Sequence, residues 1–238
     1  MKVRIKFAKR GAMKFVGHLD MMRYFQKAIR RANVAVVYSE GFSPHQKMSF
    51  AAPLGVGLTS EGEYLDIEVS ASLSSAKMLE VCNQVMAEGI EVLSWRRLPD
   101  QAKNAMALVA AADYRLTFRE GYQPKEMEQF YQGFLEFVQA ESILIIKKTK
   151  KGERELDLKP LIYQAAVEED GSIFLRVCAG SSENIKPESI LQTYYQNRLK
   201  QEMPMFAFQI QRLELYANIG TEQEKQFVPL EALGDEID

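Results

Sequence analysis

Apolar and polar positions alternate or recur in a regular order along the first 98 residues. Residues 2–8, KVRIKFA, alternate with Val3, Ile5 and Phe7 on one side, which predicts a half-buried strand. From His18 to Ala32 the apolar positions recur at spacings of three and four, which predicts an amphipathic helix. The further expected elements, in order, are a strand (34–38), two extended segments (48–58 and 64–69), a helix (74–86) and a strand (90–95). This β-α-β-β-α-β order is that of the ferredoxin-like fold.

The order of elements then recurs after a linker at 99–107, without a repeat of the residues themselves. The expected elements are a strand (114–118), a helix (124–140), a strand (143–147), a charged hairpin (147–159), strands at 161–167 and 173–178, a helix (187–200) and a closing strand (206–215). We therefore expect an α+β protein of two ferredoxin-like units packed side by side, residues 1–98 and 110–216. Residues 217–238 are expected to be an acidic tail with a frayed end.

The charge of the chain is strongly polarised. Residues 1–50 carry eleven basic residues against Asp20 and Glu40, a formal +9, so the rest must sum to −11 to give the net −2. A basic front end suggests an anionic partner, and nucleic acid is the usual one. A solvated helix face is the alternative. No apolar run approaches a membrane span of about 20 residues, and the start lacks the apolar core of a signal peptide, so we expect a cytoplasmic protein.

Candidate chemistry concentrates between Phe15 and Leu58, which holds both histidines. His18, Asp20 and His45 could act as acid and base or bind a metal, and the His18–Asp20 pair could equally cap the helix. H-x-D is a common tripeptide and the chain has no third histidine, so no metal site and no cofactor are assigned. The two cysteines, Cys82 and Cys178, have no C-x-x-C partners and are expected to be buried thiols.

Residues 15–58 could instead form a surface that binds an anion or RNA, which is the more specific interpretation. Its candidate contacts are Lys9, Arg10, Lys27, Arg30, Arg31, Ser39, His45 and Lys47. Tyr38, Phe42 and Phe50 could stack on unpaired bases, although such aromatic residues more often belong to the core. The hairpin 147–159, with Lys147, Lys148, Lys150, Lys151 and Arg154, is a second basic candidate. The loop LGVGLTSEG matches no phosphate-binding motif and is expected to be a hairpin turn.

Residues 7–57 resemble the start of the radical SAM-linked protein family, also called the DUF2344 domain, and with the segments SEGEYLDIEV (60–69) and KKGERELDLKPLI (150–162) the resemblance covers most of the chain. The matching residues are Lys9, Gly11, His18, Leu19, Asp20, Ala28, Arg30, Arg31, Ala32, Tyr38, Ser39, Gly41, Phe42, Pro44, His45, Phe50, Pro53, Leu54 and Gly57. The resemblance implies a partner, because family members stand beside or are fused to a radical SAM enzyme. The chain has no C-x-x-x-C-x-x-C motif, so it is not itself such a catalyst.

Three functions remain open at this stage. The leading hypothesis is a non-catalytic, RNA-binding accessory protein that acts with a radical SAM enzyme. The second is a nuclease-like RNA-processing enzyme that uses His18 and His45. The third is a protein-binding adaptor whose basic face docks an acidic partner without nucleic acid.

Overall fold

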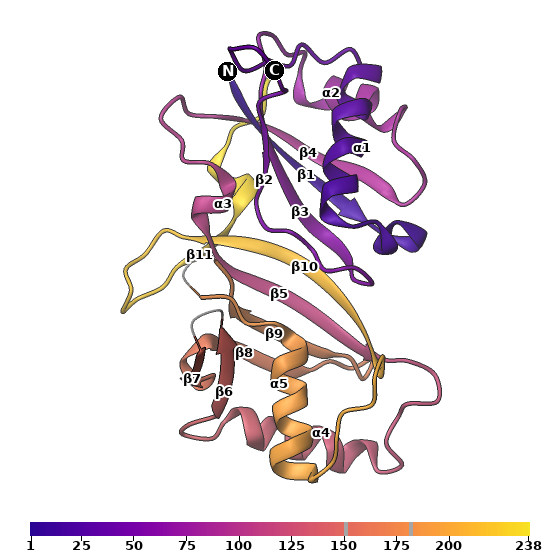
Figure 1. Ribbon diagram of the computed structural model, residues 1–238, viewed down its shortest axis with the longest axis vertical. Coiled ribbons are helices and arrows are strands. Elements are labelled where there is room, and N and C mark those ends of the chain that lie inside the picture. Colours follow the sequence, from indigo (N-terminus) through magenta and orange to yellow (C-terminus); the bar gives the residue numbers. More distant parts are fainter. Residues whose placement is uncertain (150–151, 181–182) are drawn as a thin grey trace. The chain divides into compact units, whose positions relative to one another are not determined.

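The chain folds as a mixed α+β protein with mostly antiparallel strand pairing (Figure 1). The structure is a computed structural model and describes residues 1–149, 152–180 and 183–238. The α+β class expected from the sequence is confirmed, with five α-helices in the described residues. The chain divides into two compact units: Met1–Ala111 with Arg212–Asp238, and Ala112–Gln211. The second unit is therefore inserted between the two segments of the first.

The first unit is a sheet with two longer helices on one face. Its elements are β1 (Lys2–Lys9), a 3₁₀ turn (Gly11–Phe15), α1 (His18–Arg31), β2 (Met48–Phe50), β3 (Thr59–Glu68), α2 (Ser75–Asn83), β4 (Ile90–Leu98), α3 (Ala105–Leu108), the start of β5 (Val109–Phe118), the end of β10 (Phe208–Asn218), β11 (Phe227–Pro229) and a 3₁₀ turn (Leu230–Leu233). Strand β1 pairs with β4 on one side and β3 on the other, and β2 pairs with β3, all antiparallel.

The side chains of β1 alternate between the two faces of the sheet, and both faces are buried at this strand. Val3, Ile5 and Phe7 join a core with Phe25 of α1 and Trp95 of β4. The Phe7 and Phe25 rings lie 4.5 Å apart between centroids. Because aromatic rings bury large apolar areas, this packing fixes α1 against the sheet. The N-terminal end of α1 is thereby held close to the end of β1.

The opposite face of the same sheet carries paired charges. Arg4 is fully buried and contacts Asp66 through two hydrogen bonds of 2.8 and 2.9 Å. Lys6 pairs with Glu214 at 2.6 Å and Glu231 at 2.7 Å. Because buried charges are costly unless paired and hydrogen-bonded, these contacts explain how charged residues occupy alternate positions of an internal strand.

The expected strand at residues 34–38 is wrong. Only isolated bridges form there, Val36 with Val69 and Tyr38 with Gln46. The predicted extended run 48–58 also ends early, because β2 stops at Phe50 and a loop follows. Pro53 offers no backbone N–H for a ladder, and Gly57 adopts φ +91°, so the sequence itself interrupts that strand.

The C-terminal residues pack on the first unit, in contrast to the frayed end expected from their acidic composition. Leu230 is fully buried. The backbone N–H of Arg97 donates to Asp235 O at 2.8 Å, and the N–H of Asp235 donates back to Arg97 O at 2.9 Å. The Ser75 N–H donates to Ile237 O at 2.8 Å, and the Ile237 N–H donates to the Ser75 side-chain Oγ at 2.9 Å. The chain end thus closes one edge of the unit beside β4.

The second unit combines a strand sheet, two helices and a separate hairpin. Its elements are the rest of β5, α4 (Met127–Val138), β6 (Leu144–Thr149), β7 (Gly152–Asp157), a 3₁₀ turn (Lys159–Leu161), β8 (Ile162–Val167), β9 (Ile173–Cys178), α5 (Pro187–Tyr194) continued by a π-helical turn (Tyr195–Leu199), and the start of β10. Strand β9 lies between β5 and β8. Aromatic rings of Phe130, Phe134, Phe137 and Tyr194 join the two helices.

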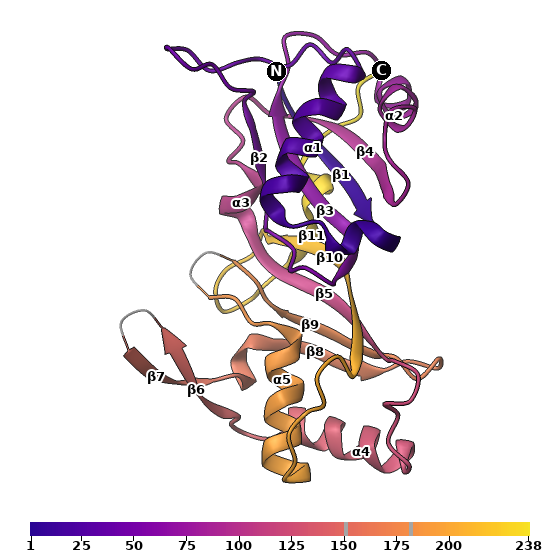
Figure 2. The ribbon, with the colours of Figure 1, turned by 45° about the vertical axis from the view of Figure 1, so that its right-hand side comes forward.

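The predicted strand 143–147 exists, but it pairs only with β7 and forms a two-stranded sheet of its own. Figure 2 shows this hairpin apart from β8 and β9. Leu144 and Ile146 are exposed there, so alternation alone could not show that the strand leaves the main sheet. The basic hairpin expected from the sequence is partly neutralised, since Lys147 and Arg154 both pair with Glu183. Lys150 and Lys151 lie outside the described residues.

No helix in the described part of the chain combines the length and the apolar character needed to cross a membrane.

Candidate nucleic-acid interface

A basic stripe runs along the exposed side of α1. Arg23, Lys27 and Arg30 stand at positions i, i+4 and i+7, which lie on one side of a helix. The buried side of α1, with Phe25 and Ile29, faces the core. The packing of α1 therefore dictates that these three cationic side chains point to solvent.

The charge of this stripe is only weakly compensated. Arg23 contacts Asp20 at 3.2 Å, but both side chains are about 70% exposed (70% and 69%), where ion pairs are worth little. Lys27 and Arg30 have no ion pair within the residues that the structure describes. Two cations thus remain free for an anionic partner.

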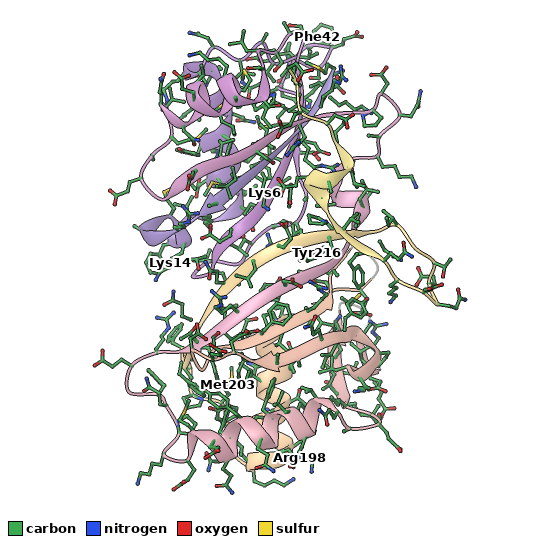
Figure 3. All side chains as sticks on the ribbon, turned by 180° about the vertical axis from the view of Figure 1, so that it is seen from behind. Lys6, Lys14, Phe42, Arg198, Met203 and Tyr216 are labelled. Atoms are coloured by element: carbon green, nitrogen blue, oxygen red, sulfur yellow. The ribbon has the colours of Figure 1, made fainter. Side chains whose placement is uncertain are left out.

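A projecting loop follows α1. Residues 38–46 form a narrow hairpin closed by the Tyr38–Gln46 bridge and by the Ser39 N–H, which donates to His45 O at 2.8 Å. Gly41 allows the turn because its φ is +104°. Figure 2 shows the loop, in indigo at the upper left, extending from the first unit, and Figure 3 labels Phe42 at the top of its view. The Phe42 side chain is fully exposed and Tyr38 is 45% exposed.

The base of the loop is bonded to α1. The side-chain Nε2 of Gln46 donates to Gln26 O at 3.2 Å and lies 3.4 Å from the Tyr38 hydroxyl. Gln26 is three residues after Arg23 and four before Arg30, so the loop base meets the helix beside the basic stripe. We call α1 residues 23–30 and loop residues 38–46 together the basic–aromatic surface.

The two histidines have different surroundings. His45 is exposed, and its Nδ1 lies 2.9 Å from the Ser39 hydroxyl, which also accepts a hydrogen bond from the His45 N–H. His18 is half-buried at the start of α1, with its ring edge-on to Phe50 at 5.4 Å. Among the described residues no contact joins His18 to His45. The predicted His18–Asp20 cap is not seen among the described contacts: Gly17 is the N-cap, no side chain caps it, and the Asp20 carboxylate accepts from Arg23.

The remaining predicted anion contacts have partners of their own. Arg10 pairs with Glu61 and Glu91, whose hydrogen bonds raise its pKa. Lys47 pairs with Glu68 at 2.9 Å, and Arg31 Nη2 donates to Val85 O at 3.1 Å. Ser39 is held by His45. These contacts leave Lys27 and Arg30 as the candidates whose charge is least compensated.

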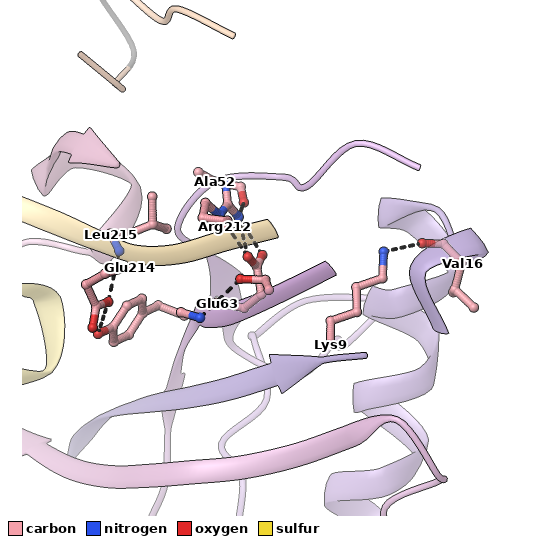
Figure 4. Close-up of polar contacts among 10 residues, drawn as sticks. Lys9, Val16, Ala52, Glu63, Arg212, Glu214 and Leu215 are labelled. Atoms are coloured by element: carbon pink, nitrogen blue, oxygen red, sulfur yellow. Dashed lines mark hydrogen bonds and ion pairs between the residues drawn. The ribbon is translucent and has the colours of Figure 1, made fainter. Parts of the chain in front are cut away.

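Lys9 lies inside the protein, 3% exposed, where its ammonium donates to Val16 O at 2.8 Å (Figure 4). Burial lowers the pKa of Lys9, while the nearby Glu63 carboxylate opposes that effect. A cavity of about 20 Å³ lies beside it, lined in part by His18, Phe50, Pro53 and Leu54. That volume has room for about one water molecule. Residues that carry the family resemblance therefore meet in a packed site at the start of α1, away from open solvent.

A buried ion pair near this cavity was not predicted from the sequence. Arg212 contacts Glu63 through hydrogen bonds of 2.6 to 2.9 Å, and both side chains are nearly fully buried (Figure 4). Arg212 also donates to Ala52 O at 2.8 Å, which holds the loop after β2. One signal was available: Arg212 falls in line with the buried Ile210 and Glu214 on alternate positions of β10. No group of three or more His, Cys, Asp or Glu side chains suited to a metal occurs in the described residues.

The protein is therefore an α+β protein whose first unit carries a solvent-exposed basic–aromatic surface. A comparison with protein-family models matches residues 2–187, more than half of the chain, to the family described as "Uncharacterized protein conserved in bacteria (DUF2344)". The chain belongs to the DUF2344 family. The matched range includes the whole basic–aromatic surface and Lys9, but it ends before Arg212. A search of curated proteins found no match to this chain.

Proposed function

We propose that this protein is a non-catalytic accessory protein that binds RNA through the basic–aromatic surface. One observation carries the proposal: Phe42 is fully exposed on a loop whose base is hydrogen-bonded to the helix that bears Lys27 and Arg30. An exposed aromatic ring is costly in water unless a partner covers it. Free cations beside it favour a partner that is both anionic and able to stack.

Single-stranded RNA fits that description. Its bases stack on aromatic rings, and its phosphates contact Lys and Arg side chains. Stacking tolerates any base, since every base has a π-face, so we expect weak sequence preference. Tyr38 and His45 offer further ring surfaces on the same loop.

We also infer that each unit is ferredoxin-like. The strand order β4-β1-β3 with β2 beside β3 supports this for the first unit, because the fold orders its four strands 4-1-3-2. In the second unit the order β10-β5-β9-β8 corresponds, with the β6–β7 hairpin as an insertion after α4. This arrangement would leave the loops and helix faces, rather than the core, to carry function.

The proposed partner is a radical SAM enzyme in the cytoplasm. The support for this part is the family resemblance and the absence of a cluster-binding cysteine motif from the sequence, which has only Cys82 and Cys178. The chain would then present an RNA, or a substrate attached to RNA, to an enzyme that performs the chemistry.

A fluorescence anisotropy titration tests RNA binding. The full chain is titrated into a labelled single-stranded RNA, a tRNA and a fully paired duplex over a series of salt concentrations. We expect saturable binding, tightest for unpaired RNA, that weakens as salt rises because phosphate contacts release counterions. Absent binding, or binding insensitive to salt, would contradict the proposal.

The same samples separate the two other functions. A nuclease-like enzyme would shorten the RNA during incubation, and that activity would disappear in His45→Asn. A protein adaptor would retain a co-expressed radical SAM enzyme in a pull-down after nuclease treatment while showing no RNA affinity. The RNA-binding proposal expects intact RNA and measurable affinity.

A further inference from the structure

A second cavity lies in the first unit, on the sheet face opposite α1 and α2. Its volume is about 220 Å³, and it lies between the ends of β1, β2, β3 and β4 and the segment 102–104. Leu98 and Ala102 supply apolar wall, together with the alkyl stems of the lysines around it. A dry cavity of about 150 Å³ holds benzene, so this one has room for a single ring with a substituent.

Three lysines line the cavity: Lys2, Lys47 and Lys103. Lys47 is compensated by Glu68. Lys2 donates to the backbone oxygens of Asp100 and Ala102 at 3.1 Å, which satisfy hydrogen bonds but carry no net charge. Lys103 is exposed and has no side-chain partner among the described residues.

The two carboxylates of the lining do not cancel these charges. Asp66 is taken by Arg4 and also accepts a hydrogen bond of 2.7 Å from the Ala105 N–H. Glu68 is taken by Lys47. The lining therefore keeps two uncompensated positive charges, those of Lys2 and Lys103.

A hydroxyl in the wall lacks a partner. The Ser49 Oγ atom is buried and has no hydrogen-bond partner within the described residues. Ser49 stands opposite Asp66 in the β2–β3 pairing, so it lies on the same sheet face as the cavity that it lines. Buried polar atoms are nearly always paired with a protein group or an ordered water, so the Ser49 hydroxyl can donate to a water or to a ligand oxygen that enters the cavity.

We propose that this cavity is a binding site for a small phosphate monoester that carries a planar ring. The dianionic phosphate matches the two uncompensated ammoniums and accepts the Ser49 O–H, while the ring lies on Leu98 and Ala102. This site is independent of the basic–aromatic surface and of any RNA bound there.

Phenyl phosphate is the probe. Isothermal titration with the full chain, followed by NMR shift mapping, should show saturable binding that perturbs residues 47–49, 66–68 and 98–104. Benzoate, with one charge, should bind more weakly, and benzyl alcohol should not bind. Lys103→Ala should weaken phenyl phosphate severalfold, whereas Lys77→Ala on the exposed surface of α2 should leave it unchanged.

Ser49→Ala distinguishes a ligand contact from an internal one. Loss of a hydrogen bond to a charged group should weaken phenyl phosphate about tenfold. Without ligand, the variant should be at least as stable as the parent, because the hydroxyl has no partner to lose. A clear loss of stability would show that Ser49 is bonded within the chain and would overturn the argument. Absence of binding, or equal binding of inorganic phosphate and phenyl phosphate, would overturn the assigned ligand.

Discussion

The side-chain amide of Gln46 donates to the backbone oxygen of Gln26 at 3.2 Å, and this bond joins the projecting loop to α1. Gln46 is nearly fully buried although it follows an exposed turn. The bond therefore fixes the stem of the loop while Phe42, four residues earlier, remains in solvent. A ring held on an anchored stem loses less conformational entropy when it meets a partner.

Loosening that anchor should affect the loop locally. In Gln46→Ala we expect the free energy of unfolding to fall by about 1 kcal/mol, the typical worth of one hydrogen bond. Hydrogen exchange of the Ser39 amide, which donates to His45 O, should accelerate more than that of amides in β1. Equal acceleration throughout the first unit would show that Gln46 serves the whole fold instead of the loop.

Removing the exposed ring should weaken RNA without harming the fold. Base–aromatic stacking is worth about 1–3 kcal/mol per base, so Phe42→Ala should lower affinity for single-stranded RNA by about tenfold or more. Its melting temperature should not change, since the ring is fully exposed and buries nothing in the free protein.

Phe15 provides the matched control for that change. It is 67% exposed on the 3₁₀ turn before α1 and lies outside the basic–aromatic surface. Phe15→Ala should leave RNA affinity unchanged. If Phe15→Ala and Phe42→Ala lowered the RNA affinity equally, the loss would be due to nonspecific apolar contact. That result would contradict a stacking role for Phe42.

The buried pair of Glu63 and Arg212 should be sensitive to the loss of one partner. Arg212→Met removes the hydrogen bonds that Arg212 donates to the buried Glu63 carboxylate and leaves only the more distant Lys9 cation near it, so urea unfolding should show a loss of about 3–5 kcal/mol. The double variant Glu63→Met with Arg212→Met removes both charges and should recover part of that loss. A double variant less stable than Arg212→Met would show that Glu63 stabilises the fold through contacts other than the one with Arg212.

The thiol of Cys82 should make stability depend on alkaline pH. Burial raises the pKa of Cys82 to about 11, above the ordinary thiol value of about 8.5–9 in an unfolded chain. The folded state therefore keeps its proton where the unfolded state loses it, and stability from this group is complete below about pH 9 and lost as pH rises toward 11.

Cys82→Ala isolates that effect. The difference in unfolding free energy between the parent and Cys82→Ala should shrink steadily between those two pH values, measured by chemical denaturation in the presence of a reductant. A difference that stays constant would mean that the thiol titrates normally in the folded protein.

The spacing of apolar residues in the sequence predicted much of the fold but little of the candidate RNA-binding site. The spacing of Phe25, Ala28 and Ile29 was enough to predict α1, because an amphipathic helix shows its buried side in the sequence. Residues 34–38 are as rich in valine as a strand, yet their backbone hydrogen bonds are divided among α1, β3, Lys47 and Ser70, which only the tertiary structure reveals. Apolar content does not distinguish a ladder from such irregular pairing.

The sequence did not show which of the candidate RNA-binding residues are exposed to solvent. Phe42 and Phe50 looked equivalent as stacking rings, but Phe50 packs on Phe7 and Phe25 in the core while Phe42 is exposed. Lys9 looked like a surface cation and is buried. Glu63 and Arg212 are 149 positions apart, so no short-range pattern could have joined them.

The salt dependence of RNA binding tests the central claim most directly. For single strands each phosphate contact adds about 0.7 to the slope of log affinity against log salt, so Lys27→Ala with Arg30→Ala should reduce the slope by about 1.4. Lys77→Ala, which removes one exposed cation from α2, should leave the slope unchanged. A parent and a Lys27/Arg30 double variant with the same slope and the same affinity would contradict the placement of RNA on the basic–aromatic surface.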